Sequence, residues 1–231
     1  QINQKTSSNI WGQRKVTTTA RMESGEVRIG RIGPVHPLGV CYQRGQSLIC
    51  VDPLQDDGSP VWVRENVPPG SDLFGDNEFL FVVPADATEA MVLRQIDASS
   101  VGPRMVPPAE NRWTTVGRKI LTWKQSGQRL VLTLYDPWYE EDVWSYPFPV
   151  GSKGCLVDQD QVAILATDGR FTLISLADGA ILIDEMLEPE PILDAIHVLR
   201  FSDQTILATT TSLVSNRHQS VRVAAAPSPS Y

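Results

Sequence analysis

A short segment, residues 136–142, carries the densest group of side chains that could bind a ligand. It holds four carboxylates and two large aromatic rings, from Asp136, Trp138, Tyr139, Glu140, Glu141 and Asp142. Carboxylates and ring faces attract cations, and an aromatic face can stack on a sugar. We therefore consider a loop that binds a cationic partner, or a sugar stacked on Trp138. The favoured alternative is a solvated loop with one ring folded back over a sheet edge.

Other reactive residues fall short of a catalytic or metal-binding pattern. Three aspartates precede Gly58 in a calcium-like segment, but Pro53 and Gln55 stand where the calcium loop needs ligands, which favours a plain turn. The three histidines are far apart, and neither G-x-S-x-G nor H-E-x-x-H occurs, so a structural role is favoured for each histidine. We expect no catalytic residue and no metal ligand.

The three cysteines raise the question of a disulfide. Cys41 and Cys50 flank one hairpin turn and could face each other across two strands. A disulfide there stays open, although small apolar fillers in buried strands are the favoured interpretation. Cys155 has no obvious partner. Because no C-x-x-C spacing occurs, we expect neither a zinc nor a redox site.

Charge and hydropathy exclude some partners. The 231 residues include 27 acidic and 20 basic side chains, a formal charge of −7, so a general nucleic-acid binder is not expected. No stretch approaches the roughly 18 apolar residues that a membrane span needs. The chain begins at Gln1 without a signal-peptide pattern, and we expect either a removed leader or a piece of a longer protein.

Four hairpin-turn signals recur at almost constant spacing, at residues 44–46, 86–88, 126–128 and 168–170. Their middle residues are 42, 40 and 42 positions apart, and a period of about 40–45 residues made of strands is typical of propeller blades. Three of the units end a strand in an aspartate, at Asp52, Asp97 and Asp136. Such a carboxylate can accept backbone N–H groups in the turn that follows.

The strands between these turns are apolar on both faces, as in residues 130–135, which predicts sheets stacked against neighbours on both sides. No convincing helix appears. We predict an all-β chain of about four to five β-propeller blades, each a four-stranded antiparallel sheet. Residues 1–34 form an N-terminal segment or partial blade, with 1–15 as a loop or frayed end. Residues 35–223 hold the repeats, and 224–231 a linker or truncated blade.

These units resemble the quinoprotein-like (PQQ-like, WD40-like) repeat of β-propellers. The best copies run from residues 46–52 to Trp62 and from residues 128–136 to Trp144, and residues 168–176 match at the turn. The resemblance implies that Trp62 and Trp144 close a blade by packing between adjacent sheets, a structural role. Because a propeller normally closes into a ring and the four to five units fall short at both ends, we expect the native protein to be longer, although a compact five-bladed ring stays open.

The resemblance specifies function less closely. Quinoprotein dehydrogenases add a vicinal cysteine disulfide, a Ca²⁺ site and an aspartate base, and no adjacent cysteine pair exists here. Many relatives bind no cofactor and act as interaction scaffolds, including lipoproteins of envelope assembly. The resemblance thus implies a non-catalytic, extracytoplasmic module that binds a protein or peptide partner. The alternative is a partial chain of a PQQ-dependent oxidoreductase, with PQQ and calcium bound through further blades.

Overall fold

The computed structural model describes residues 2–8, 14–22, 25–36, 39–55, 58–201, 204–212 and 219–227. The chain divides into two compact units, one made of Gln1–Thr122 with Tyr135–Glu141 and the other of Trp123–Leu134 with Asp142–Tyr231.

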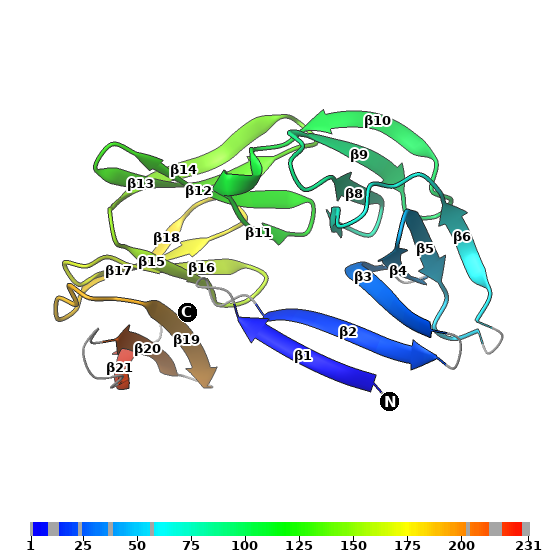
Figure 1. The fold of residues 1–231 in the computed structure, drawn as a ribbon. Coiled ribbons are helices and arrows are strands. Elements are labelled where there is room, and N and C mark those ends of the chain that lie inside the picture. The colour runs from blue at the N-terminus through cyan, green and yellow to red at the C-terminus, as the bar shows by residue number, and fades with distance from the viewer. Residues whose placement is uncertain are drawn as a thin grey trace. The chain divides into compact units, whose positions relative to one another are not determined.

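Strands dominate the described residues, with a single short 3₁₀ helix, Ala109–Asn111 (Figure 1). The strands in chain order are β1 (Ile2–Ser8), β2 (Arg14–Met22), β3 (Gly25–His36), β4 (Gly39–Arg44), β5 (Ser47–Val51), β6 (Pro60–Arg64), β7 (Asp72–Gly75), β8 (Phe79–Val83), β9 (Glu89–Arg94), β10 (Ser100–Met105), β11 (Arg112–Val116), β12 (Lys119–Ser126), β13 (Arg129–Asp136), β14 (Glu141–Pro149), β15 (Lys153–Leu156), β16 (Gln161–Leu165), β17 (Arg170–Ser175), β18 (Ile181–Met186), β19 (Ala195–Phe201), β20 (Gln204–Ser212) and β21 (Gln219–Pro227).

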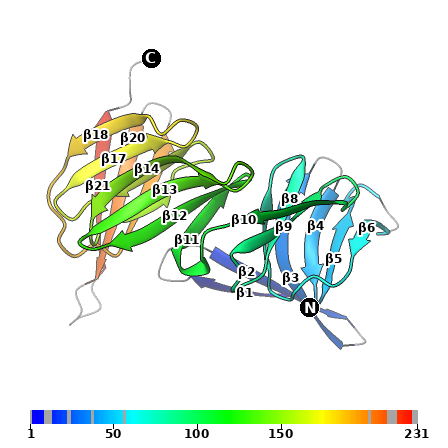
Figure 2. The same cartoon turned by 90° about the horizontal axis from the view of Figure 1, so that it is seen from above.

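Strands that follow one another in sequence are neighbours in the sheets, as the second view also shows (Figure 2). The described strands form one six-stranded sheet (β1 to β6), three four-stranded sheets (β7 to β10, β11 to β14, β15 to β18) and one three-stranded sheet (β19 to β21). A four-stranded meander of this kind is the unit of a propeller blade. The prediction of an all-β chain made of blade-type sheets is confirmed.

The four expected turns join β4 to β5, β8 to β9, β12 to β13 and β16 to β17. The first strand of each four-stranded sheet, β7, β11 or β15, was not expected. Two terminal segments also differ from expectation, because β1 lies within residues 1–15 and β21 continues to Pro227, past the expected boundary at residue 223.

Both faces of β8 are buried, and each face belongs to a different core. Leu80 and Val82 pack in a cluster with Cys41, Leu48 and other residues of the first sheet. The alternate residues of β8, Phe79, Phe81 and Val83, pack in a second cluster that includes Ile120 of β12. Side chains alternate between the faces of a strand, so one apolar strand serves two interfaces between sheets. The predicted two-sided burial is confirmed here.

In the second unit, a third cluster joins two further sheets. Phe171 and Leu173 of β17 are almost fully buried, and they pack with Ile196 of β19 and Leu207 of β20. Burying such side chains stabilises the fold by about 1.5–3 kcal/mol each. The stacking of consecutive sheets therefore recurs within this unit.

Two tryptophans occupy matching positions in the two units. Trp62 on β6 is buried, and its Nε1–H donates to the carbonyl of Gln95, 2.8 Å away in the next sheet. Trp144 on β14 is also buried, and its Nε1–H donates to the carbonyl of Leu176 at 3.4 Å. Both acceptors stand two residues before an aspartate, Asp97 or Asp178. This is the geometry that a ring packed between adjacent sheets requires.

The turns that receive these rings share one backbone form. The carboxylates of Asp97 and Asp178 each accept the N–H group two residues further on, at 2.9 and 3.0 Å. The residue after each aspartate has a positive φ, 56° at Ala98 and 76° at Gly179. A Cβ atom at position 179 would lie only 2.7 Å from Cγ of Trp144. Glycine is therefore needed there both for φ and for the close approach of the ring.

Replacing Gly179 by alanine tests this close approach. Gly127→Ala is the matched control, because Gly127 has a similar φ of 61° and nothing within 4 Å of an added Cβ. Both variants should lose about 1–2 kcal/mol of unfolding free energy because alanine is strained at positive φ. Gly179→Ala should lose about 1–3 kcal/mol more through displacement of Trp144. Urea denaturation measures both, and equal losses would contradict the ring contact.

Candidate functional site

The candidate loop, residues 136–142, joins β13 to β14, and its first residues are fixed in place. The Asp136 carboxylate is almost fully buried and accepts the N–H of Trp138 at 2.9 Å. Pro137 is buried as well. Glu140 has a φ of 58°, and one of its carboxylate oxygens accepts the N–H of Met105 at 3.2 Å. The loop is therefore held by its own turn and by β10.

The Trp138 ring is folded back over the core of the first unit. It stacks on Phe79, with ring centroids 4.3 Å apart and an interplanar angle of 23°. The guanidinium of Arg104 lies 4.9 Å from the Trp138 ring and that of Arg118 lies 5.8 Å away, both within cation–π range. The cations expected from a partner are thus already supplied by the chain itself. This arrangement corresponds to the alternative that the sequence favoured for one ring.

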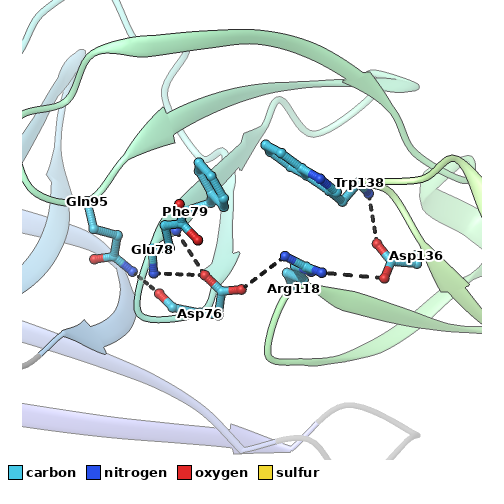
Figure 3. A network of polar contacts seen from close by, with 7 residues as sticks. All are labelled: Asp76, Glu78, Phe79, Gln95, Arg118, Asp136 and Trp138. Carbon is cyan, nitrogen blue, oxygen red and sulfur yellow. Dashed lines mark hydrogen bonds and ion pairs between the residues drawn. The ribbon is translucent and has the colours of Figure 1, made fainter. Parts of the chain in front are cut away.

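Arg118 links two strand-end aspartates beneath the ring (Figure 3). Its guanidinium lies 3.6 Å from a carboxylate oxygen of Asp76 and 3.9 Å from one of Asp136. The Asp136 side chain is 4% exposed, so Arg118 balances a charge that water scarcely reaches. Sequence reasoning missed this arginine and Asp76, since neither lies in a recognisable motif.

The network continues from Asp76 to the tryptophan-bearing sheet. The other Asp76 oxygen accepts the N–H groups of Glu78 and Phe79, both at 2.9 Å, and the backbone carbonyl of Asp76 accepts the Gln95 side-chain amide at 2.5 Å (Figure 3). Gln95 is buried, and its backbone carbonyl accepts a hydrogen bond from the indole N–H of Trp62. A chain of polar contacts thus joins the interface closed by Trp62 to the loop that carries Trp138.

The outer part of the loop remains open to solvent. Tyr139 is 65% exposed, and the Arg118 guanidinium lies 5.9 Å from its ring. Glu140 and Glu141 are exposed, as is the following residue, Asp142, which begins the next stretch of the second unit. Of the predicted binding residues, Trp138 therefore packs against the core of the first unit. Tyr139 and the carboxylates of Glu140, Glu141 and Asp142 are exposed to solvent.

The strand-end aspartates serve the turns that follow them. The Asp52 carboxylate accepts the N–H of Leu54 at 2.9 Å, as Asp97 and Asp136 do for the residues two positions on. Contact with the hydroxyl of Ser99, and then with its N–H, lowers the pKa of Asp97. Each of the three carboxylates therefore stabilises the turn that follows its strand.

The other candidate sites suggested by the sequence were metal, calcium, histidine and cofactor sites. No group of three or more histidine, cysteine, aspartate or glutamate side chains in the described part of the chain is placed to hold a metal ion. Asp56, Asp57 and His218, on which the calcium and histidine hypotheses partly rested, lie outside the described residues. The vicinal disulfide and acidic cage that PQQ with calcium would use have no counterpart among the described side chains.

All three cysteines are free thiols. Cys41 and Cys50 are a directly opposed pair on β4 and β5, and both are buried in the first core cluster, as the favoured interpretation expected. Burial raises the pKa of both thiols. Cys155 is only partly buried, and this partial burial raises its pKa to about 11. Because the thiolate is the nucleophilic form of cysteine, raised pKa values disfavour nucleophilic or redox chemistry at these three residues.

Among the described residues, no helix has the length and apolar character needed to cross a bilayer. No protein-family model matches the chain, and a search of curated proteins finds no match.

Solved structures resemble the chain at low identity. BamB from Moraxella catarrhalis shares 13% identity over 84% of this chain, with a TM-score of 0.44, and the chain spans only 63% of the BamB chain. Hsv2 from Kluyveromyces lactis shares 9% identity over 93% of this chain and 80% of its own, with a TM-score of 0.43. A chain of a mitotic checkpoint complex shares 9% identity over 90% of this chain and 70% of its own, with a TM-score of 0.44.

The class of protein is defined by the chain's own strand order, since likenesses of this size specify neither a family nor a partner. Consecutive meander sheets, stacked through apolar faces, define an all-β protein built of β-propeller blades. This agrees with the quinoprotein-like repeats that the sequence resembles.

Thiol reactivity tests the burial of the cysteines. A raised pKa means less thiolate at a given pH, and at pH 8 a thiol with a pKa of about 11 is only about 0.1% ionised. We expect the native protein to react slowly with Ellman's reagent at pH 8, and guanidinium to release three fast thiols. The Cys155→Ser variant reports Cys41 and Cys50 alone. A thiol that reacts equally fast with and without guanidinium would contradict its burial.

The coupling of Arg118 to Asp136 is measurable as stability. Arg118→Met keeps a long side chain beside Trp138 but removes the charge facing the buried Asp136 carboxylate. We expect a loss of about 1–3 kcal/mol in unfolding free energy, the usual cost of a buried acceptor that loses its partner. In an Asp136→Asn background the same substitution should cost clearly less. Equal losses in the two backgrounds, measured by urea denaturation, would show no coupling.

Proposed function

We propose that this chain is a non-catalytic binding module made of propeller blades, and that residues 139–142 recognise a protein or peptide partner with exposed cationic groups. The observation that carries the proposal is the contrast within one loop. Asp136 and Trp138 are locked into the frame, whereas Tyr139 is 65% exposed beside two exposed glutamates.

A rigid loop with an exposed tyrosine suits protein recognition. Tyrosine is among the residues that contribute most to interface affinity, since it offers a large amphipathic surface with few rotatable bonds. Binding costs less when the backbone already has its bound form. The Arg118 network and the Phe79–Trp138 stack fix this backbone before any partner arrives. Loops carried on a rigid frame are also where binding residues concentrate.

Charge indicates the kind of partner. Glu140, Glu141 and Asp142 stand in sequence next to Tyr139, and the whole chain has a formal charge of −7. Complementary charge speeds encounter and disfavours acidic competitors. The Trp138 face is covered within the chain, so the open features are the Tyr139 ring and the carboxylates around it. Extracytoplasmic placement belongs to the same proposal and is supported by the repeat resemblance.

Quantitative pull-down from the source cells tests the loop. Tyr139→Ala removes the exposed ring, and Glu141→Lys reverses one charge without touching the frame. Either should lower recovery of the specific partner about tenfold or more, the size expected for a central interface residue. Leu54→Ala is the matched control, because Leu54 is an apolar side chain 88% exposed elsewhere in the first unit. Equal recovery with all variants and the wild type would reject the loop as the binding site.

A further inference from the structure

The last strand of a blade-type sheet lies at an open edge, and this chain protects most such edges with proline. Pro60 lies on β6, Pro103 on β10, Pro147 and Pro149 on β14, and Pro227 on β21. Proline cannot donate a ladder hydrogen bond, so it discourages the pairing of a further strand. Among these last strands β18, with the sequence ILIDEM, has none.

At the opposite edge of two of the described sheets, the first strand packs against other sheets. In the first unit β7 lies against β3 and β11, and in the second unit β15 lies against β19. Among the described strands, β18 makes extensive backbone contacts with β17 alone, while the side chain of Ile183 packs against the third core cluster. The outer edge of β18 is therefore more accessible than the outer edges of β7 and β15.

Register shows which backbone groups the edge offers. The Leu187 N–H donates to the Gly169 carbonyl at 2.9 Å, so this directly opposed pair is hydrogen-bonded. Pairing in an antiparallel ladder alternates, and Glu185 is therefore bonded to β17 in the same way. Asp184 and Met186 stand on either side of Glu185, so their backbone N–H and C=O groups point away from β17. A bulge near Ile181 leaves this part of the register regular.

The side chains on this edge are apolar and acidic. Ile181 is 47% exposed and Met186 is 67% exposed. The Asp184 carboxylate accepts two hydrogen bonds, each 2.7 Å long, from the guanidinium of Arg170 on β17. This bidentate ion pair links β18 to β17. Glu185 is exposed, and two further glutamates follow the strand at Glu188 and Glu190. An incoming strand would meet apolar contacts and negative charge.

We propose that β18 accepts an extended peptide segment with alternating basic and apolar side chains, which adds to the sheet as its next strand. Main-chain hydrogen bonds to Asp184 and Met186 supply affinity, and the exposed Glu185 carboxylate selects basic side chains. The proposal uses none of residues 139–142, so it does not require that loop to bind.

A second copy of the chain is a poor occupant of the same edge. Two β18 strands side by side would bring acidic side chains close to one another, and like charges facing across strands are destabilising. Each copy also has a formal charge of −7. Charge complementarity therefore favours a basic peptide.

A synthetic probe tests the edge directly. A fluorescein-labelled peptide of alternating lysine and valine should bind the full chain saturably in fluorescence anisotropy. Met186→Pro removes an outward N–H that β17 does not use, and it should weaken binding at least about tenfold, since each tenfold is only about 1.4 kcal/mol. Met186→Ala, which keeps the N–H, is the matched control and should lose less. A glutamate–valine peptide and a backbone N-methylated lysine–valine peptide should bind poorly.

Hydrogen exchange on the unmodified protein gives a second readout that needs no variant. The amides of Asp184 and Met186 should exchange rapidly in the free chain and become protected when the lysine–valine peptide binds. Equal binding by the N-methylated peptide or by folded Met186→Pro would overturn the proposal, as would self-association through β18 in light scattering. Protection at residues 139–141 in place of β18 would also overturn it, while supporting the loop proposed above.

Discussion

Burial on both faces of the same strand is the constraint on which this structure depends. All five residues of β8 are buried, and alternate residues belong to cores shared with different sheets. Each large apolar side chain that moves from water into such a core stabilises the chain by about 1.5–3 kcal/mol. Neither face could remain exposed without forfeiting several of these contributions. A sheet of this kind is therefore stable only between neighbours.

Polar contacts then fix how the stacked sheets meet. Trp62 donates to the carbonyl of Gln95, and the Gln95 side chain in turn donates to the carbonyl of Asp76. The Asp76 carboxylate faces Arg118, which also balances Asp136. Buried polar groups satisfied in this way specify one arrangement more sharply than apolar packing alone. The position of the Tyr139 loop is thus a consequence of contacts that begin at the Trp62 ring.

The fold class could be predicted from the sequence because two strong local signals coincide. Turn residues recur at steps of 40–42, and the intervening runs are too apolar for a sheet with a wet face. The first strands β7, β11 and β15 escaped prediction because they are only four or five residues long and mix polar residues or glycine with few apolar ones. Tertiary packing decides such segments, since local propensity is weak.

The candidate site was predicted only in part, for a related reason. The acidic and aromatic composition of residues 136–142 marks the loop, but it does not say which ring turns inward. That choice depends on Phe79, Arg104 and Arg118, which lie far from Trp138 in sequence and meet it only in the folded chain. Similarly, no sequence pattern marks Gln95 as the residue that joins two sheets.

Ala98 and Gly179 hold the same place in two turns, with a left-handed backbone in each case. At Gly179 the aromatic ring of the preceding sheet comes too close to admit a methyl group, whereas Ala98 shares a core cluster with Trp62. The residue tolerated in one repeat is therefore set by the ring that reaches it from the repeat before. The ring and the turn residue that it contacts can therefore change together from one repeat to the next. A sequence profile that averages each position separately over the repeats would miss this dependence and would weaken the signal of their common origin.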